Sequence, residues 1–270
     1  MVVVSYGGGT NSTALLIKLV QDGEKVDLIL FADTGGESPE TYAYIAMFSK
    51  WLQERGYPAI KTLYYTNKDG ERQTLESELL RAETLPSPCY GWKRCSQKYK
   101  GGVIEKCCNN HDPFKSTWKH CEKVIKVIGY DAGERRRKDG AEIYTNTDKK
   151  YTYRYPLIDE WDWGRSECVK AIQDAGLPLP GKSSCFFCPN MKKKEIVALH
   201  KNHPDLFARA VEIERRGRHN SETIKGLGRN YNWEEFIKYT QQPVFKDQVG
   251  MCFLYEDESD DNMPCGCYDG

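Results

Sequence analysis

The sequence has no excess of charge of either sign and no long apolar run. Its 39 Lys and Arg residues balance 39 Asp and Glu residues, so no overall field attracts the chain to nucleic acid or to an anionic membrane. No stretch approaches the roughly 18–20 apolar residues that span a bilayer. A signal peptide has a basic segment before its apolar run, and the opening MVVVSYGGG has none. These absences favour a cytoplasmic protein without a membrane partner, and composition carries no information on the oligomeric state.

Cysteine, in contrast, is abundant, with 11 residues in a chain of 270. The count is odd and the spacing uneven, which argues against the disulfide framework of a secreted domain. In a reducing compartment, clustered cysteines act more often as metal ligands or nucleophiles. Cys121, Cys168 and Cys252 stand apart from the clusters, and we expect them to be small buried apolar residues.

The apolar pattern alternates between strands and helices. Residues 2–6 and 26–32 are nearly continuous apolar runs, as expected of strands buried on both faces, and 60–66 and 123–130 are similar. A segment with helical spacing follows the first run, and Ser38-Pro39 opens a helix after the second. This pattern predicts an α/β fold with a mainly parallel sheet of five or six strands sandwiched by helices.

Composition along the chain suggests three regions. We expect a nucleotide-binding α/β domain over residues 1–160, with a cysteine-rich insertion at about 86–122. A helical, cysteine-rich, metal-binding region would cover 161–255, and the cysteine-rich segments would form a lobe at the carboxyl edge of the sheet. Residues 256–270 form an acidic tail that carries further cysteines.

The turn between the first strand and the first helix is rich in glycine. It comprises Gly7, Gly8, Gly9, Thr10, Asn11 and Ser12. Glycines at such a turn let the backbone approach an anion, and the amides at the helix N-terminus can bind a phosphate or sulfate. The turn matches neither GxxxxGK[ST] nor GxGxxG, so it predicts phosphate binding without either of those motifs.

Several segments, taken in order, resemble known families. Residues 7–12 resemble the SGGxDS pyrophosphate loop of the N-type ATP pyrophosphatases. FADTGGESPETY at 31–42 is similar to the FxDTGxxxPETY segment of the phosphoadenosine phosphosulfate (PAPS) reductase family. Later segments of that family resemble CSQKYK at 95–100, YPLI at 155–158 and GKSSCFFCP at 181–189. IGYDAGER at 128–135 resembles a further segment loosely.

The resemblance implies an adenine nucleotide, ATP or PAPS, across the carboxyl ends of the strands in an adenine nucleotide α-hydrolase-like fold. Its phosphates would lie on residues 7–12 and its adenosine end near Phe31, Asp33 and Gly35. Arg135 would face phosphate or sulfate as a catalytic residue. The loop departs from the family pattern at Gly7, where the family has Ser, and at Asn11, where a carboxylate would help to hold Mg²⁺ on the phosphates.

The strongest metal signal is the Cys-x-x-Cys pair Cys185 and Cys188, which is followed by a proline. A closed site needs further ligands, and we expect Cys89 and Cys95 to supply them, because Cys95 belongs to a segment that resembles the family. The vicinal pair Cys107-Cys108 is the alternative. The resemblance favours a [4Fe-4S] cluster on Cys89, Cys95, Cys185 and Cys188, with zinc as the alternative metal.

Three functions are compatible with these features. The first is a PAPS reductase-family enzyme that reduces a sulfonucleotide, with Cys265 as the nucleophile and a thioredoxin-type protein as the reductant. The second is an ATP-dependent sulfurtransferase that adenylates a nucleobase or nucleic acid. In that case residues 192–194 and the arginines at 215–218 could contact a nucleic acid backbone, although solvated helix faces explain them more simply. The third is a non-catalytic nucleotide-binding or redox-sensing protein.

Overall fold

A sheet of five parallel strands forms the centre of the protein. The computed structural model describes residues 1–241. The strands are β1 (Val2–Ser5), β2 (Leu28–Asp33), β3 (Ile60–Tyr64), β4 (Val124–Ile128) and β5 (Tyr151–Arg154). They lie in the order β3-β2-β1-β4-β5, and every pair is parallel. The predicted α/β fold is therefore confirmed, with a sheet that is wholly parallel over the described residues.

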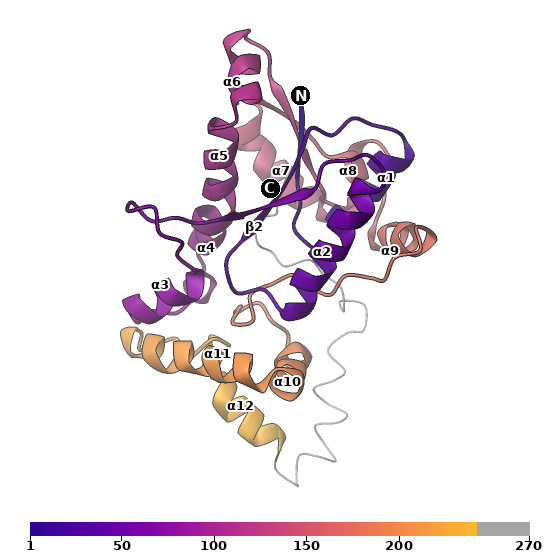
Figure 1. Ribbon diagram of the computed structural model, residues 1–270. Helices are drawn as coiled ribbons and strands as arrows, with labels where there is room; N and C mark the ends of the chain where they lie inside the picture. Colours follow the sequence, from indigo (N-terminus) through magenta and orange to yellow (C-terminus); the bar gives the residue numbers. More distant parts are fainter. Residues whose placement is uncertain (242–270) are drawn as a thin grey trace.

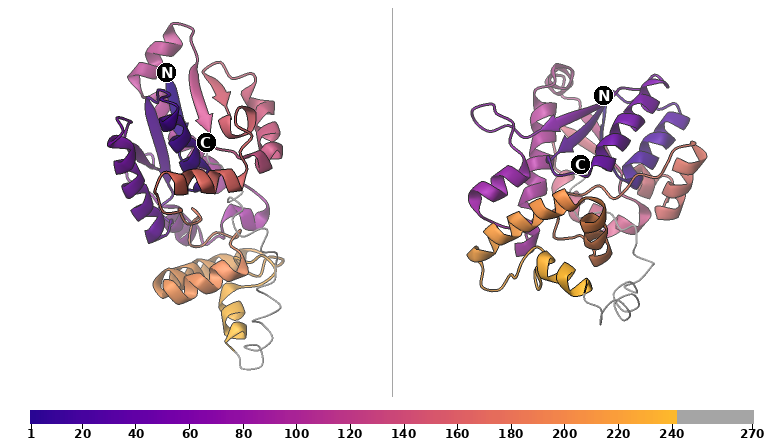
Figure 2. Two further views of the ribbon diagram at one scale, coloured as in Figure 1. Left: turned by 90° about the vertical axis from the view of Figure 1, so that its right-hand side faces the viewer. Right: turned by 60° about the horizontal axis from the view of Figure 1, so that its bottom comes forward.

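Helices cover both faces of this sheet (Figures 1 and 2). On one face lie α1 (Thr10–Gln21), α2 (Pro39–Gln53) and α9 (Arg165–Asp174), and on the other α5 (Gly102–Asn109) and α6 (Asp112–Lys119). Leu15, Phe48 and Ile172 are fully buried in the first core, and Phe114 in the second. Because α9 packs against α1, the core of the sheet continues past residue 160.

Two irregular connections border the sheet. Between β3 and α5 the chain forms α3 (Leu75–Ala82), the 3₁₀ turn η1 (Ser87–Tyr90), α4 (Arg94–Ser96) and the π turn η2 (Gln97–Gly101). Between β4 and β5 it forms η3 (Ala132–Glu134) and α7 (Arg135–Thr145), and α8 (Pro156–Asp159) follows β5. Helix α7 has no buried residue and is attached at the sheet edge through β5.

A helical lobe lies beyond the carboxyl ends of the strands (Figure 1). It contains α10 (Lys193–Asn202), α11 (Pro204–Gly217), η4 (Arg218–Asn220) and α12 (Trp233–Thr240), with α3 and η1 packed against them. Phe187, from the Cys-x-x-Cys segment, and Trp233 are completely buried in its core. The lobe predicted at the carboxyl edge is thus present. None of the helices within residues 1–241 combines the length and apolar character needed to cross a bilayer.

The three isolated cysteines have different environments. Cys168 is completely buried on α9, as predicted. The prediction for Cys121 is wrong: this residue is exposed, in a left-handed turn with φ of 59° that ends α6. Cys252 and the predicted acidic tail lie outside the described residues.

A buried carboxylate, Glu214, holds the lobe together. It accepts hydrogen bonds from the backbone N–H of Leu227 (2.7 Å) and of Trp233 (2.8 Å), and so joins α11 to the start of α12. Glu214 is only 2% exposed. Burial raises the pKa of Glu214 to about 7, against the opposing effect of the backbone donors. Near neutral pH the folded lobe therefore binds a proton that the unfolded chain has released.

This predicts a pH-dependent stability that Glu214→Gln removes. A raised pKa in the folded state means that the full stability is present below the ordinary value of 4.5 and is lost as the pH rises through about 7. The free energy of unfolding should change by roughly 3 kcal/mol or less over this pH range. Thermal unfolding of both proteins, followed by tryptophan fluorescence from pH 4.5 to 8, should show wild-type stability falling relative to the variant. Parallel curves would contradict the assignment.

Candidate functional site

The strand order predicts a ligand crevice at the carboxyl ends of β1 and β4. The chain leaves β1 toward β2 on one side, whereas β4 lies on the other side of β1. Open parallel sheets generally bind their ligands at such a switch point. The glycine loop follows β1, and residues 129–131 follow β4. The loops approach closely, since a Cβ on Gly129 would lie 3.0 Å from Cα of Ser12.

The glycine loop has the backbone of an anion-binding turn. Gly8 has φ of +78°, a left-handed conformation that favours glycine. Gly9 is the N-cap of α1 and has no side chain to cap the first amides of that helix. The N-terminal amides and the helix dipole therefore favour an anion here. Thr10, Asn11 and Ser12 are buried in the first turn.

Two carboxylates lie against Asn11. Its Nδ2 donates to Oδ2 of Asp131 (2.8 Å) and to Oε2 of Glu134 (3.1 Å). Nη1 of Arg165 donates to Oδ1 of Asn11 (3.1 Å) from the start of α9. Asn11 itself carries no charge, but its neighbours bring two negative charges and one positive charge to the loop.

The arginine at this loop is Arg165, which the sequence did not single out. Arg135, the predicted catalytic arginine, is exposed on α7 and pairs with Asp162 at 2.6 Å. Arg137 pairs with Glu134 at 2.8 Å. No pattern marks Arg165, because it opens a helix about 150 residues after the loop that it contacts.

The end of β2 supplies the second wall of the crevice. Asp33 is buried, and its Oδ1 accepts hydrogen bonds from the Gly35 amide (2.7 Å) and the Tyr42 hydroxyl (2.8 Å). Its Oδ2 accepts from Arg72 at 3.2 Å. Phe31 is buried beside Gly8. Asp33 thus shapes the loop after β2 as well as contributing charge near the crevice.

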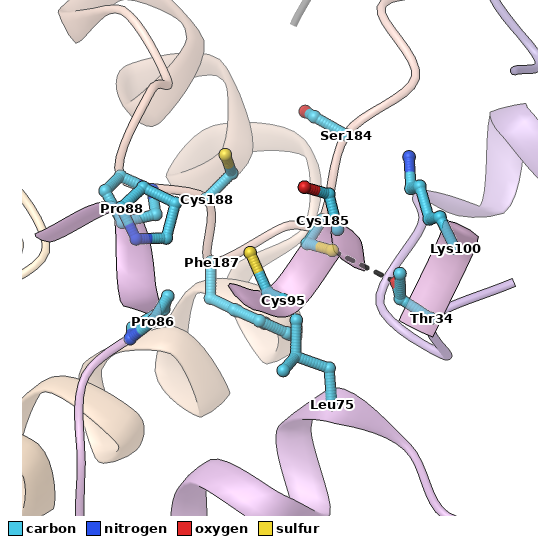
Figure 3. A pocket seen from close by; sticks show the side chains of 12 residues that line it. Thr34, Leu75, Pro86, Pro88, Cys95, Lys100, Ser184, Cys185, Phe187 and Cys188 are labelled. Atoms are coloured by element: carbon cyan, nitrogen blue, oxygen red, sulfur yellow. Dashed lines mark hydrogen bonds between the residues drawn. The ribbon is translucent and has the colours of Figure 1, made fainter. Parts of the chain in front are cut away.

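Three cysteines surround one cavity next to this loop. Cys95, Cys185 and Cys188 line a space of about 30 Å³ (Figure 3). The remaining lining residues are Thr34, Leu75, Pro86, Pro88, Ser96, Lys100, Ser184, Phe187 and Pro189. The three thiols come from two segments that are about 90 residues apart in the chain, and the fold places these three of the four expected ligands around one cavity.

The Cys-x-x-Cys segment is joined to the loop after β2 by several contacts. The Phe186 amide donates to the Gly36 carbonyl at 2.7 Å, and Ser183 Oγ donates to Glu37 at 3.0 Å. Sγ of Cys185 and Oγ1 of Thr34 are 3.1 Å apart, as the dashed line in Figure 3 shows. The thiol cavity therefore shares a wall with the predicted nucleotide crevice.

Lys100 is the cation of the thiol cavity. It is buried, it lines the cavity, and its Nζ lies 3.9 Å from the fully buried carboxylate of Glu37. A nearby ammonium group favours the thiolate form of a cysteine. Lys100 is the last residue of the CSQKYK segment.

The fourth predicted ligand, Cys89, does not line this cavity. Its Sγ lies 3.9 Å from the carbonyl oxygens of Gly226 and Leu227, and burial raises its pKa to about 12. The alternative pair Cys107-Cys108 is on α5, where Cys108 packs in the core between that helix and the sheet. Cys265, the predicted nucleophile, lies outside the described residues.

The donor set around the cavity has the right chemistry for a thiolate-bound metal group. Both a [4Fe-4S] cluster and zinc accept cysteine thiolates. Among residues 1–241, no three Cys, His, Asp or Glu side chains are grouped closely enough to hold a single metal ion. Because a cluster spreads its ligands over several irons, three separated thiols around one cavity suit a cluster better than one ion.

Comparisons with known proteins give two likenesses. No family model matches the sequence. An uncharacterized protein of Methanocaldococcus jannaschii, MJ0973, is 24% identical over 255 residues, which cover 86% of this chain and 51% of that protein. The chain thus spans about half the length of this relative. Among solved structures, the U34-tRNA thiolase NcsA from Methanococcus maripaludis with its [4Fe-4S] cluster aligns with 77% of this chain and 69% of its own, at 16% identity and a TM-score of 0.43.

Proposed function

We propose that this chain is an ATP-dependent sulfur-transfer enzyme that adenylates a carbonyl group of a nucleobase and replaces its oxygen by sulfur. The observation that carries the proposal is the wall shared by two sites of different chemistry. Thr34 follows β2 at the predicted nucleotide crevice and contacts Cys185 of the thiol cavity at 3.1 Å. Activation by a nucleotide and attack by sulfur can therefore occur next to each other.

In the first step, the acceptor oxygen attacks the α-phosphorus of ATP, and pyrophosphate leaves. The amides of the glycine loop are suited to bind the charged phosphates. Asp131 and Glu134 supply carboxylates beside Asn11, where they would hold Mg²⁺ on these phosphates. Arg165, at 3.1 Å from Asn11, adds a positive charge for the phosphates.

In the second step, a hydrosulfide ion attacks the adenylated carbon. A C–S bond forms, AMP leaves with the former carbonyl oxygen, and the hydrosulfide proton is released, so no electron is gained or lost overall. Cys95, Cys185 and Cys188 would hold a [4Fe-4S] cluster, which when bound supplies an iron that can bind sulfide.

Reduction of a sulfonucleotide is the competing interpretation. It requires Cys265 as the nucleophile, and none of the described residues bears on that role. The thiols that the structure brings to the crevice are those of the cavity, and they favour sulfur transfer. Incubation of the anaerobic protein with ATP, sulfide and nucleic acid should yield pyrophosphate and a thiolated nucleoside, whereas incubation with PAPS and a thiol reductant should yield no sulfite.

ATP binding is expected to depend on Gly8. A valine there must adopt a left-handed backbone, and its Cβ would lie 3.3 Å from Ser183 Oγ and 3.5 Å from Phe31. Gly8→Val should weaken ATP binding at least 10-fold in calorimetry, because the loop must shift. Gly56→Val is the matched control, since Gly56 has φ of +80° with open space around it. Equal affinity in wild type and Gly8→Val would exclude this loop as the nucleotide site.

The role of the Asp131 carboxylate can be tested by moving the carboxylate to position 11. Asp131→Asn removes the charge that contacts Asn11 and should slow pyrophosphate release at least 10-fold if that carboxylate binds Mg²⁺. The double variant Asn11→Asp/Asp131→Asn restores one carboxylate on the other side of the same 2.8 Å contact and should recover much of the rate. A double variant as slow as the single one would show that the charge acts elsewhere or not at all.

Two single substitutions distinguish a thiol of the cavity from the thiol of Cys89. Cys185→Ser should lose iron, sulfide and sulfur transfer, because it removes one of the three thiols around the cavity. Cys89→Ser should retain all three, because the Cys89 thiol faces backbone carbonyls instead of this cavity. Metal and sulfide analysis of anaerobically purified variants gives the readout. Loss of iron in both variants would support the four-cysteine ligand set instead.

A further inference from the structure

A second, larger cavity adjoins the thiol cavity. It has a volume of about 760 Å³ and lies between α3, η1 and η2. Its lining comprises Leu75, Glu78, Leu79, Ala82, Thr84, Leu85, Ser87, Tyr90, Trp92, Arg94, Cys95, Gln97, Lys98 and Tyr99. Leu75 and Cys95 line both cavities, so one thiol of the smaller cavity forms part of the wall of the larger. We call this larger cavity the α3–η2 groove.

The α3–η2 groove has an exposed aromatic ring at its edge. Trp92 is 66% exposed, although Trp is usually the residue with the most apolar area to bury. Its indole makes no ring contact with another described residue. Tyr90 and Tyr99 add two further rings to the lining. An exposed indole beside such a groove is suited to stack on a flat, unpaired base.

The same edge carries positive charge that the protein does not neutralise. Within residues 1–241, the side chains of Lys93 and Arg94 have no hydrogen-bond or ion-pair partner, and both residues are exposed. In contrast, Arg215 and Arg216 on the lobe pair with Glu234 and Glu212, at 2.8 and 2.7 Å. The groove edge therefore offers free cations to a phosphate backbone.

We propose that the α3–η2 groove binds one unpaired nucleotide of a single-stranded nucleic acid segment, with the base against Trp92 and the flanking phosphate at Lys93 and Arg94. The volume suits a ligand of this size. An unpaired strand is required, because a base inside a duplex cannot reach the Cys95 wall. As the acceptor site, the groove rests on the proposed function, but its binding of nucleic acid does not depend on ATP or sulfide.

The test measures binding alone, with fluorescein-labelled single-stranded RNA and DNA of 10 nucleotides and fluorescence anisotropy on the full chain. Trp92→Ala should weaken binding about 5- to 100-fold, as expected for the loss of one stacked base. Tyr144→Ala is the control, because Tyr144 is also an exposed aromatic, at 80%, but lies on α7. Arg94→Gln should lower the slope of log affinity against log salt by about 0.7.

Failure of this proposal can be told apart from failure of the proposed function. Binding that depends on Trp92, without a thiolated product, would support the groove and contradict sulfur transfer. A thiolated product made equally well by Trp92→Ala would place the acceptor elsewhere and overturn the groove. Equal losses in Trp92→Ala and Tyr144→Ala, or no binding to either oligonucleotide, would also overturn it. The RNA and DNA arms identify which sugar the site accepts.

Discussion

The hydrogen bond between the Phe186 amide and the Gly36 carbonyl joins the two halves of this protein. At 2.7 Å it attaches the Cys-x-x-Cys segment to the loop after β2, and Ser183 and Cys185 add side-chain contacts on either side. Such close approach requires glycine at position 36, because a Cβ there would lie 2.8 Å from the Phe187 ring. Phe187 is itself buried in the lobe core. This backbone contact and the two side-chain contacts beside it thus hold the thiols against the sheet.

The charge around the glycine loop comes from other elements of the fold and not from the loop itself. The family that the glycine loop resembles has a carboxylate at the position of Asn11, and the Asn11 amide cannot replace that charge. The fold brings Asp131 to the same point from the end of β4, at 2.8 Å from Asn11. Arg165 arrives from α9 and completes the network. Because the three residues come from three separate elements, a departure in the loop alone does not decide whether the site can bind a metal–nucleotide complex.

Much of the fold could be predicted from the sequence, because apolar runs that are buried on both faces and separated by helices have few other solutions. The Cys-x-x-Cys pair and Cys95 were also predictable as neighbours, since the segments carrying them resemble one family. Arg165 and Lys93-Arg94 could not be predicted, because nothing local distinguishes them from ordinary surface cations. The same holds for Cys89, which is close to Cys95 in sequence but has a thiol that faces the carbonyls of residues 226–227. In each case the surroundings of the side chain depend on the direction it takes, and direction is set by tertiary packing.

The thiol cavity and the α3–η2 groove share a wall. Leu75 lines both, and its amide donates to the Thr34 carbonyl at 2.9 Å, so the partition between them is built on the loop after β2. The thiol cavity contains little room, at about 30 Å³, whereas the groove has about 760 Å³. A large ligand can therefore occupy the groove but not the thiol cavity. Because Thr34 belongs to that loop, a shift of the loop would act on both cavities at once.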